Sequence, residues 1–141
     1  MVKSQFVSEM LQGQMYWFDN SGSPAQKKSP TAYLLPNYDE YFIGFKDRSA
    51  IGEVAQKAGI KGDDPALIAH IIILNGQIVG GWRRTLKKDE VIVEASLITK
   101  LNKAEEQAVA ATAERFGRFL ELPVLLIYKE HTNEQRKTRS L

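Results

Sequence analysis

Cysteine is absent from the 141-residue sequence, which excludes disulfide bonds, thiolate metal sites and cysteine nucleophiles. This absence suits a reducing compartment, and we expect a cytoplasmic protein. Long apolar runs are missing as well: the longest, residues 66–74, is far too short to cross a bilayer and contains His70. The first twenty residues alternate polar and apolar side chains instead of forming the apolar core of an export signal. We therefore expect no membrane as a partner.

The residues that build metal and cofactor sites are equally scarce. The chain has two histidines, His70 in an apolar segment and His131 in a polar one, and neither has an acid or a second histidine at metal-ligand spacing. No serine lies in a nucleophile elbow, and no glycine run matches a phosphate-binding or dinucleotide-binding loop. We expect no metal and no cofactor, and we interpret His70 as a core residue or a satisfied polar group.

The composition is that of an ordinary globular protein, with 43% hydrophobic and 26% charged residues. The length fits one domain with one core, which we assign to residues 1–128, followed by a polar and flexible tail at residues 129–141. The net charge is only +2, but residues 71–141 contain twelve Lys and Arg against nine Asp and Glu. Such a basic excess is typical of a solvated face or of a surface that contacts phosphates.

Strand and turn signals dominate the chain, and one long helix stands out. Gln12–Gly13 and Asn75–Gly76 are predicted hairpin turns, the second of type I′. Asn102 and Glu105 form a capping box that begins a helix. The predicted strands are residues 4–11, 14–19, 31–36, 67–74, 77–86, 91–98 and 124–128, with a loop at 20–30 and a helix at 103–121. We predict an α+β fold with an antiparallel, barrel-like sheet, one long C-terminal helix and one or two short helices.

Residues 34–50, LLPNYDEYFIGFKDRSA, combine aromatic residues with acids. The aromatic residues recur at i, i+3, i+4 and i+7, the spacing of one helical face: Tyr38, Tyr41, Phe42 and Phe45. Asn37 and Glu40 form a capping-box pattern, and Gly44 occupies the place of a left-handed residue that ends a helix. We predict a short helix in which Tyr38, Tyr41 and Phe42 are buried and Gly44 has a positive φ. A second short helix is predicted between Ser49 and Gly59.

Two charged pairs in this segment allow a chemical interpretation beside a structural one. Asp39 and Glu40 could act as a general acid–base pair, but adjacent helical residues point about a third of a turn apart, so helix capping explains them better. Asp47 and Arg48 could hold a phosphate or a carboxylate through the planar guanidinium. The favoured alternative is that Arg48 pairs with an acid inside the fold.

The best binding candidate is the basic segment WRRTLKK, residues 82–88. Trp82 and Arg84 fall on one face of the predicted strand and Arg83 on the other, so the two arginines cannot both face the core. The glycines of VGGW, residues 79–82, favour a bulge or a close approach of two backbones. The candidate DNA-contacting residues are Arg48, Arg83, Arg84, Lys87 and Lys88.

Three segments, residues 34–48, 74–85 and 101–123, together resemble one family in order and spacing. They are similar to the C-terminal region of the bacterial winged-helix DNA-binding family that includes the AlkZ-like DNA glycosylases. The family pattern Leu-Leu-Pro-x-aromatic-Asp-x-aromatic runs into Gly-aromatic-x-Asp-Arg, and a later hairpin carries Gly-x-Trp-Arg-Arg. The motif positions that we interpret as structural are Leu34, Leu35, Pro36, Tyr38, Asp39, Tyr41, Gly44, Asp47, Gly80 and Trp82.

The resemblance implies a β-rich domain that supports tandem winged helices on DNA. It also implies excision of alkylated or crosslinked bases without a metal, through a Gln-x-Gln or Gln-x-Asp motif in the winged-helix portion, which this chain does not contain. Gln12 and Gln14 have the right spacing, but they lie on a predicted turn and strand directly before the Leu-Leu-Pro segment. We do not assign them the catalytic role.

Three functional interpretations follow. The first is a DNA-binding or scaffolding module, non-catalytic alone, that binds double-stranded DNA weakly and without sequence preference, and that has a winged-helix portion of a longer protein as a possible partner. The second is a fragment of a DNA-repair glycosylase whose active site lies outside this chain. The third is a protein-interaction domain that does not bind DNA.

Overall fold

The computed structural model describes residues 6–19, 21–22, 30–44, 46–59 and 70–129. These residues form two sheets and three helices. One sheet has two strands and the other has five, in the order β3-β4-β5-β6-β7. The predicted boundary between a domain at 1–128 and a tail stays a prediction, because residues 130–141 lie outside the described residues.

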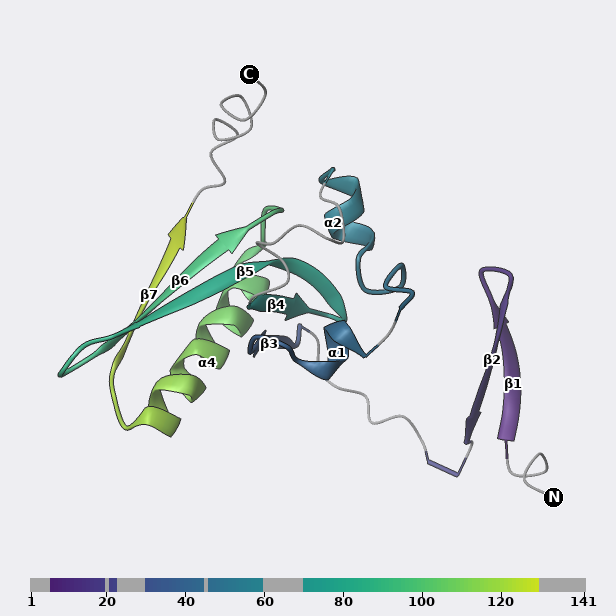
Figure 1. The fold of residues 1–141 in the computed structure, drawn as a ribbon, viewed down its shortest axis with the longest axis horizontal. Helices are drawn as coiled ribbons and strands as arrows, with labels where there is room; N and C mark the ends of the chain where they lie inside the picture. The colour runs from purple at the N-terminus through teal and green to yellow at the C-terminus, as the bar shows by residue number, and fades with distance from the viewer. Residues whose placement is uncertain (1–5, 20, 23–29, 45, 60–69, 130–141) are drawn as a thin grey trace.

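The two-stranded sheet is an antiparallel hairpin of β1 (Phe6–Leu11) and β2 (Gln14–Asp19), as the sequence predicts. Its turn residues, Gln12 and Gly13, both have positive φ values, 50° and 82°, the requirement of a type I′ turn. In Figure 1 this hairpin lies apart from the five-stranded sheet.

The five-stranded sheet is mixed and open. Strands β3 to β6 pair antiparallel, and β7 pairs parallel to β6. Their bounds are Ala32–Leu35 for β3, Ile71–Leu74 for β4, Gln77–Leu86 for β5, Val91–Leu97 for β6 and Val124–Lys129 for β7. The prediction of an all-antiparallel sheet is therefore wrong for β7, and a closed barrel is not confirmed, because β3 and β7 remain the two edges. The parallel pairing arises because a helix connects β6 to β7 and returns the chain to the end of the sheet at which β6 begins.

Helices cover both faces of this sheet (Figure 1). On one face, α4 (Lys103–Leu120) buries Val109 and Ala113 against alternate residues of the strands, Trp82 among them. On the other face, α1 (Glu40–Ile43) and α2 (Glu53–Lys57) contribute Phe42 and Ala55 to a second cluster. Strand β4 is buried along its whole length because its alternate residues enter both clusters. The predicted long helix and its capping box are confirmed.

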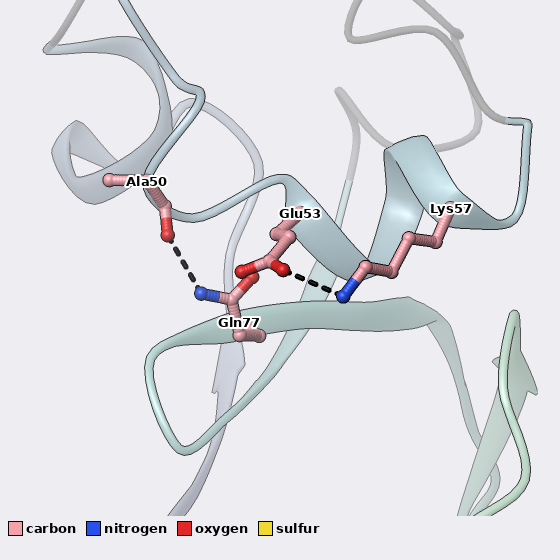
Figure 2. Close-up of polar contacts among 4 residues, drawn as sticks. All are labelled: Ala50, Glu53, Lys57 and Gln77. Carbon is pink, nitrogen blue, oxygen red and sulfur yellow. Dashed lines mark hydrogen bonds and ion pairs between the residues drawn. The ribbon is translucent and has the colours of Figure 1, made fainter. Parts of the chain in front are cut away.

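Helix α2 is fastened to the start of β5 by its preceding turn. The Gln77 side-chain amide donates a 2.7 Å hydrogen bond to the Ala50 carbonyl, as Figure 2 shows. Within the helix, Lys57 Nζ lies 2.7 Å from a carboxylate oxygen of Glu53. The helix begins at Glu53, four residues after the predicted start, and the chain leaves it at Gly59, where φ is 72°.

A bulge shapes β5 near its middle. Ile73 pairs with Ile78 whereas Ile72 pairs with Gly80, so Val79 is the extra residue. A Cβ atom on Gly80 would overlap the carbonyl oxygen of Ser96 on the neighbouring strand. Both predicted roles of the glycine segment, a bulge and a close backbone approach, are confirmed.

The aromatic segment differs from its prediction in three respects. Helix α1 has Asp39 as its N-cap, with the carboxylate accepting a 2.9 Å hydrogen bond from Tyr41 N, whereas Asn37 was predicted. Gly44 has a φ of −66°, and the positive φ of 60° belongs to Tyr38. Phe42 is buried at 4% exposure, but the predicted burial of the two tyrosines is wrong, because Tyr38 is 70% exposed and Tyr41 is also exposed.

The physical reason is the length of the helix. A single turn ends before a face of i, i+3, i+4 and i+7 positions can form, and Tyr38 precedes the N-cap altogether. Phe45, the last member of the predicted face, lies outside the described residues.

Candidate nucleic-acid interface

The basic segment forms the outer half of β5 and the turn that follows it. Trp82 is buried against α4, while both arginines after it are exposed. The turn to β6 is closed by a hydrogen bond from Lys87 N to the Glu90 carbonyl, 2.9 Å. Lys87 and Lys88 are exposed in this turn. Four of the five candidate DNA-contacting residues, Arg83, Arg84, Lys87 and Lys88, are thus brought together at one end of the sheet.

Acidic neighbours offset part of this positive charge. Lys87 Nζ lies 3.1 Å from a carboxylate oxygen of Glu90. Arg83 stands directly opposite Glu94 in the pairing of β5 with β6, and Glu94 also binds Lys129 at 2.7 Å. Arg84, on the other face of the strand, has the buried Val93 as its register partner. The two arginines therefore differ in electrostatic surroundings although both are exposed.

A series of side-chain contacts connects Arg84 to the core through three rings. Arg84 Nη1 lies 3.5 Å from His70 Nε2, and the imidazole packs edge-on against Trp82 with ring centroids 5.2 Å apart. Trp82 in turn packs edge-on against Phe116 of α4, at 5.5 Å. Desolvation lowers the pKa of His70, and the positive charge of Arg84 lowers this pKa further. A neutral imidazole can accept a hydrogen bond from the guanidinium through Nε2.

Hydrogen bonds tie the two motif segments of the sequence to each other. Trp82 Nε1 donates to the Leu35 carbonyl at 2.8 Å, and the Tyr41 hydroxyl donates to the Gly76 carbonyl at 3.1 Å. The Leu-Leu-Pro segment and the Gly-x-Trp-Arg-Arg hairpin therefore hold one another in register across the sheet. This arrangement is consistent with a structural role for these motif residues.

The fifth candidate, Arg48, lies elsewhere and is already engaged. Its guanidinium carbon sits 4.4 Å from the centroid of the Phe42 ring, and its Nε donates to the Phe42 carbonyl at 2.6 Å. Among the described residues it forms no ion pair, so its pairing with an acid stays a prediction. Asp47 instead accepts from Ser49 N at 2.9 Å, and hydrogen bonds from Ser49 lower the pKa of Asp47.

The other chemical candidates do not assemble into a reaction centre. Asp39 caps α1, as the capping interpretation predicts. Gln12 lies in the turn of the β1–β2 hairpin, and Gln14 accepts a long hydrogen bond, 3.4 Å, from the Tyr16 hydroxyl. Within the described ranges no group of three or more His, Cys, Asp and Glu residues could hold a metal ion. None of the helices in that part of the chain is long and apolar enough to cross a membrane.

Two exposed apolar features were not predicted from the sequence. Strands β1 and β2 are predicted correctly, but their large apolar residues are exposed: Phe6, Val7, Met10, Leu11, Met15, Tyr16, Trp17 and Phe18. Phe119 of α4 is 83% exposed. The signal for Phe119 was present, because it falls outside the apolar stripe of Val109, Ala113, Phe116 and Leu120. For the β1–β2 hairpin the sequence gives no signal of exposure, because the alternation of a strand does not show which residues pack against either face of the hairpin.

A mixed sheet covered by helices, with an exposed basic strand end, defines a small α+β domain. The chain belongs to the AlkZ-like DNA glycosylase family, whose model matches residues 2–119. Among solved structures it is similar to the DNA glycosylase AlkZ of Streptomyces sahachiroi, with a TM-score of 0.53 and 16% sequence identity. That similarity covers 87% of this chain and 34% of AlkZ, so the chain spans about a third of the length of that protein. No curated protein matches the chain.

Proposed function

We propose that this chain is a DNA-binding or scaffolding module of DNA repair that is not catalytic by itself. The observation that carries the proposal is the grouping of Arg83, Arg84, Lys87 and Lys88, all exposed, at the free end of β5 and its turn. Membership in a DNA glycosylase family makes DNA the matching polyanion. Contacts of this kind go to phosphates and bring no base preference.

The binding should be weak and sensitive to salt. A module with three or four phosphate contacts belongs with non-specific binders, whose dissociation constants are about 10⁻⁴–10⁻⁶ M at physiological salt. Because Lys87 is already paired with Glu90, its contribution is smaller than that of a free lysine. We therefore expect the slope of log K against log salt to correspond to fewer phosphate contacts than the four basic side chains of this segment.

The charge-reversal variant Lys87→Glu/Lys88→Glu tests this interface. We expect it to lose most of the affinity for a labelled duplex at low salt and to show a flatter dependence of log K on log salt than the unmodified chain. Fluorescence anisotropy at two salt concentrations measures both quantities. The matched control is Lys100→Glu/Lys103→Glu, which makes the same change in net charge at the opposite end of β6, where both lysines are exposed. Equal binding by the test variant and the unmodified chain, or no binding by either, would remove this interface.

A glycosylase fragment with its active site in other residues is the first alternative, and the 34% coverage of AlkZ supports it. On both this proposal and the main one, the 141-residue chain should release no modified base from alkylated DNA, because its described residues contain no acid, base or nucleophile constellation. Mass spectrometry of the supernatant measures the release. Base release that disappears in Gln12→Ala or Gln14→Ala would overturn the prediction and assign catalysis to this chain.

A protein-interaction domain without DNA binding is the second alternative, and the β1–β2 hairpin favours it. A two-stranded sheet is marginally stable in water, yet this hairpin exposes eight large apolar residues over both of its faces. An exposed apolar surface of this kind is typical of sites that contact other proteins. If the unmodified chain binds no duplex at low salt, this alternative is favoured over the two proposals that involve DNA.

A further inference from the structure

Phe119 is the most exposed large hydrophobic residue in the described part of the chain, at 83%. It lies in the last turn of α4, whose buried residues are Val109, Ala113 and Gly117. Phe119 therefore points away from the face that packs on the sheet, while Phe116, one turn earlier, packs against Trp82. Core packing does not account for an aromatic ring at this position.

The end of α4 and the basic turn occupy the same end of the molecule, as Figure 1 shows. Val91 N, just after the turn, donates a 2.9 Å hydrogen bond to the carbonyl of Pro123, just after the helix. The contact of Trp82 with Phe116 aligns β5 with α4. From that contact, β5 continues outward to Arg84 and Leu86 on the face of Trp82, while α4 continues outward to Phe119. Leu86 is also exposed, at 58%.

The charge on this face is less compensated than the charge on the opposite face. Arg115 precedes Phe119 by four residues and so lies beside it on the helix surface. Neither Arg84 nor Arg115 forms an ion pair within the described residues, whereas Lys87 is bound to Glu90 and Arg83 stands opposite Glu94. Glu121, directly after the helix, is the acid nearest to Phe119 in sequence.

We propose that Arg84, Arg115 and Phe119 form an aromatic and cationic contact for DNA, which turns the α4 side of the basic hairpin toward the duplex. The arginines bind phosphates, and the Phe119 ring stacks on an unpaired base or wedges into a weakened base step. The inference rests on the proposed DNA binding and deepens it by naming the ligand: DNA with an unpaired or poorly stacked base. Its support is the combination of exposed aromatic area with arginines that form no ion pair among the residues that the structure describes.

The test compares two duplexes of equal length, one fully paired and one with a single unpaired 2-aminopurine. The unmodified chain should prefer the second and should quench its fluorescence. Phe119→Ala should lose about ten-fold in affinity for that duplex and most of the quenching, with little change for the paired duplex. Phe119→Tyr should keep both. Because Phe119 is almost fully exposed, Phe119→Ala should unfold at the same urea concentration as the unmodified chain, which controls for folding.

The arginines are tested by the salt slope on the paired duplex. Arg84→Ala and Arg115→Ala should each flatten the slope by about 0.9. Lys103→Ala, an exposed cation at the opposite end of α4, should leave it unchanged. If the chain binds DNA but Phe119→Ala matches it on both duplexes, or Arg84→Ala and Arg115→Ala flatten the slope no more than Lys103→Ala, the inference is wrong while the proposed function stands. If the unmodified chain binds neither duplex, the proposed function fails and the inference fails with it.

Discussion

Replacing Trp82 by Ala should lower the free energy of unfolding by about 3–5 kcal/mol. Trp82 is 5% exposed and belongs to the cluster between the sheet and α4. Its ring lies against both His70 and Phe116, and truncation would leave a cavity among residues that hold β5, β4 and α4 together. Urea unfolding followed by circular dichroism measures the loss.

The variant Trp82→Phe separates packing from hydrogen bonding. It keeps an aromatic ring in the cluster but leaves the Leu35 carbonyl without the 2.8 Å hydrogen bond from the indole. We expect it to cost about 1–3 kcal/mol, the range for a buried polar group that loses its partner. A loss below about 1 kcal/mol in Trp82→Ala would show that the ring does not join the sheet to α4.

Phe42→Ala should also cost about 3–5 kcal/mol, through the cluster on the opposite face of the sheet. Phe42 is buried together with Ala55, Ile71, Ile73 and Ile78. The guanidinium of Arg48 also lies over its ring. Truncation therefore removes a cation–π contact as well as the apolar packing. The measurement is again the free energy of unfolding in urea.

Tyr38→Ala is the matched control for this variant. It truncates an aromatic residue of the same segment that is exposed rather than buried, so we expect a change within about 0.5 kcal/mol. A loss in Tyr38→Ala as large as that in Phe42→Ala would mean that both rings are packed, as the helical spacing alone predicts.

Local sequence signals predicted two hairpin turns and the N-terminal cap of α4 correctly. Asn75–Gly76 and Gln12–Gly13 are hairpin turns with positive φ values at both residues, and Asn102 with Glu105 is a capping box. The conformations at these positions depend on residues no more than four positions apart. For that reason the sequence alone predicts these turns and this cap. Family motifs at the same positions predict the same turns and the same helix.

The aromatic segment shows where such reasoning stops. The spacing of its aromatic residues describes a helical face, but Asp39 begins the helix late and its single turn ends at Ile43. Which ring is buried then depends on β4 and β5, which follow about thirty residues later in the chain and supply the cluster around Phe42. Likewise, Arg48 binds the Phe42 ring and carbonyl where the sequence favoured an acid.

By itself, the sequence determined the α+β class, the hairpins, the capped helix, the basic strand end and the family, because these follow from local periodicity, turn chemistry and motif order. Only the tertiary structure decided that β7 runs parallel to β6, that both Arg83 and Arg84 are exposed, and that Phe119 is exposed in the last turn of α4. The physical reason is that strand direction and side-chain exposure are set by contacts between elements far apart in the chain. The helix between β6 and β7 fixes both the direction of β7 and the place where Phe119 emerges.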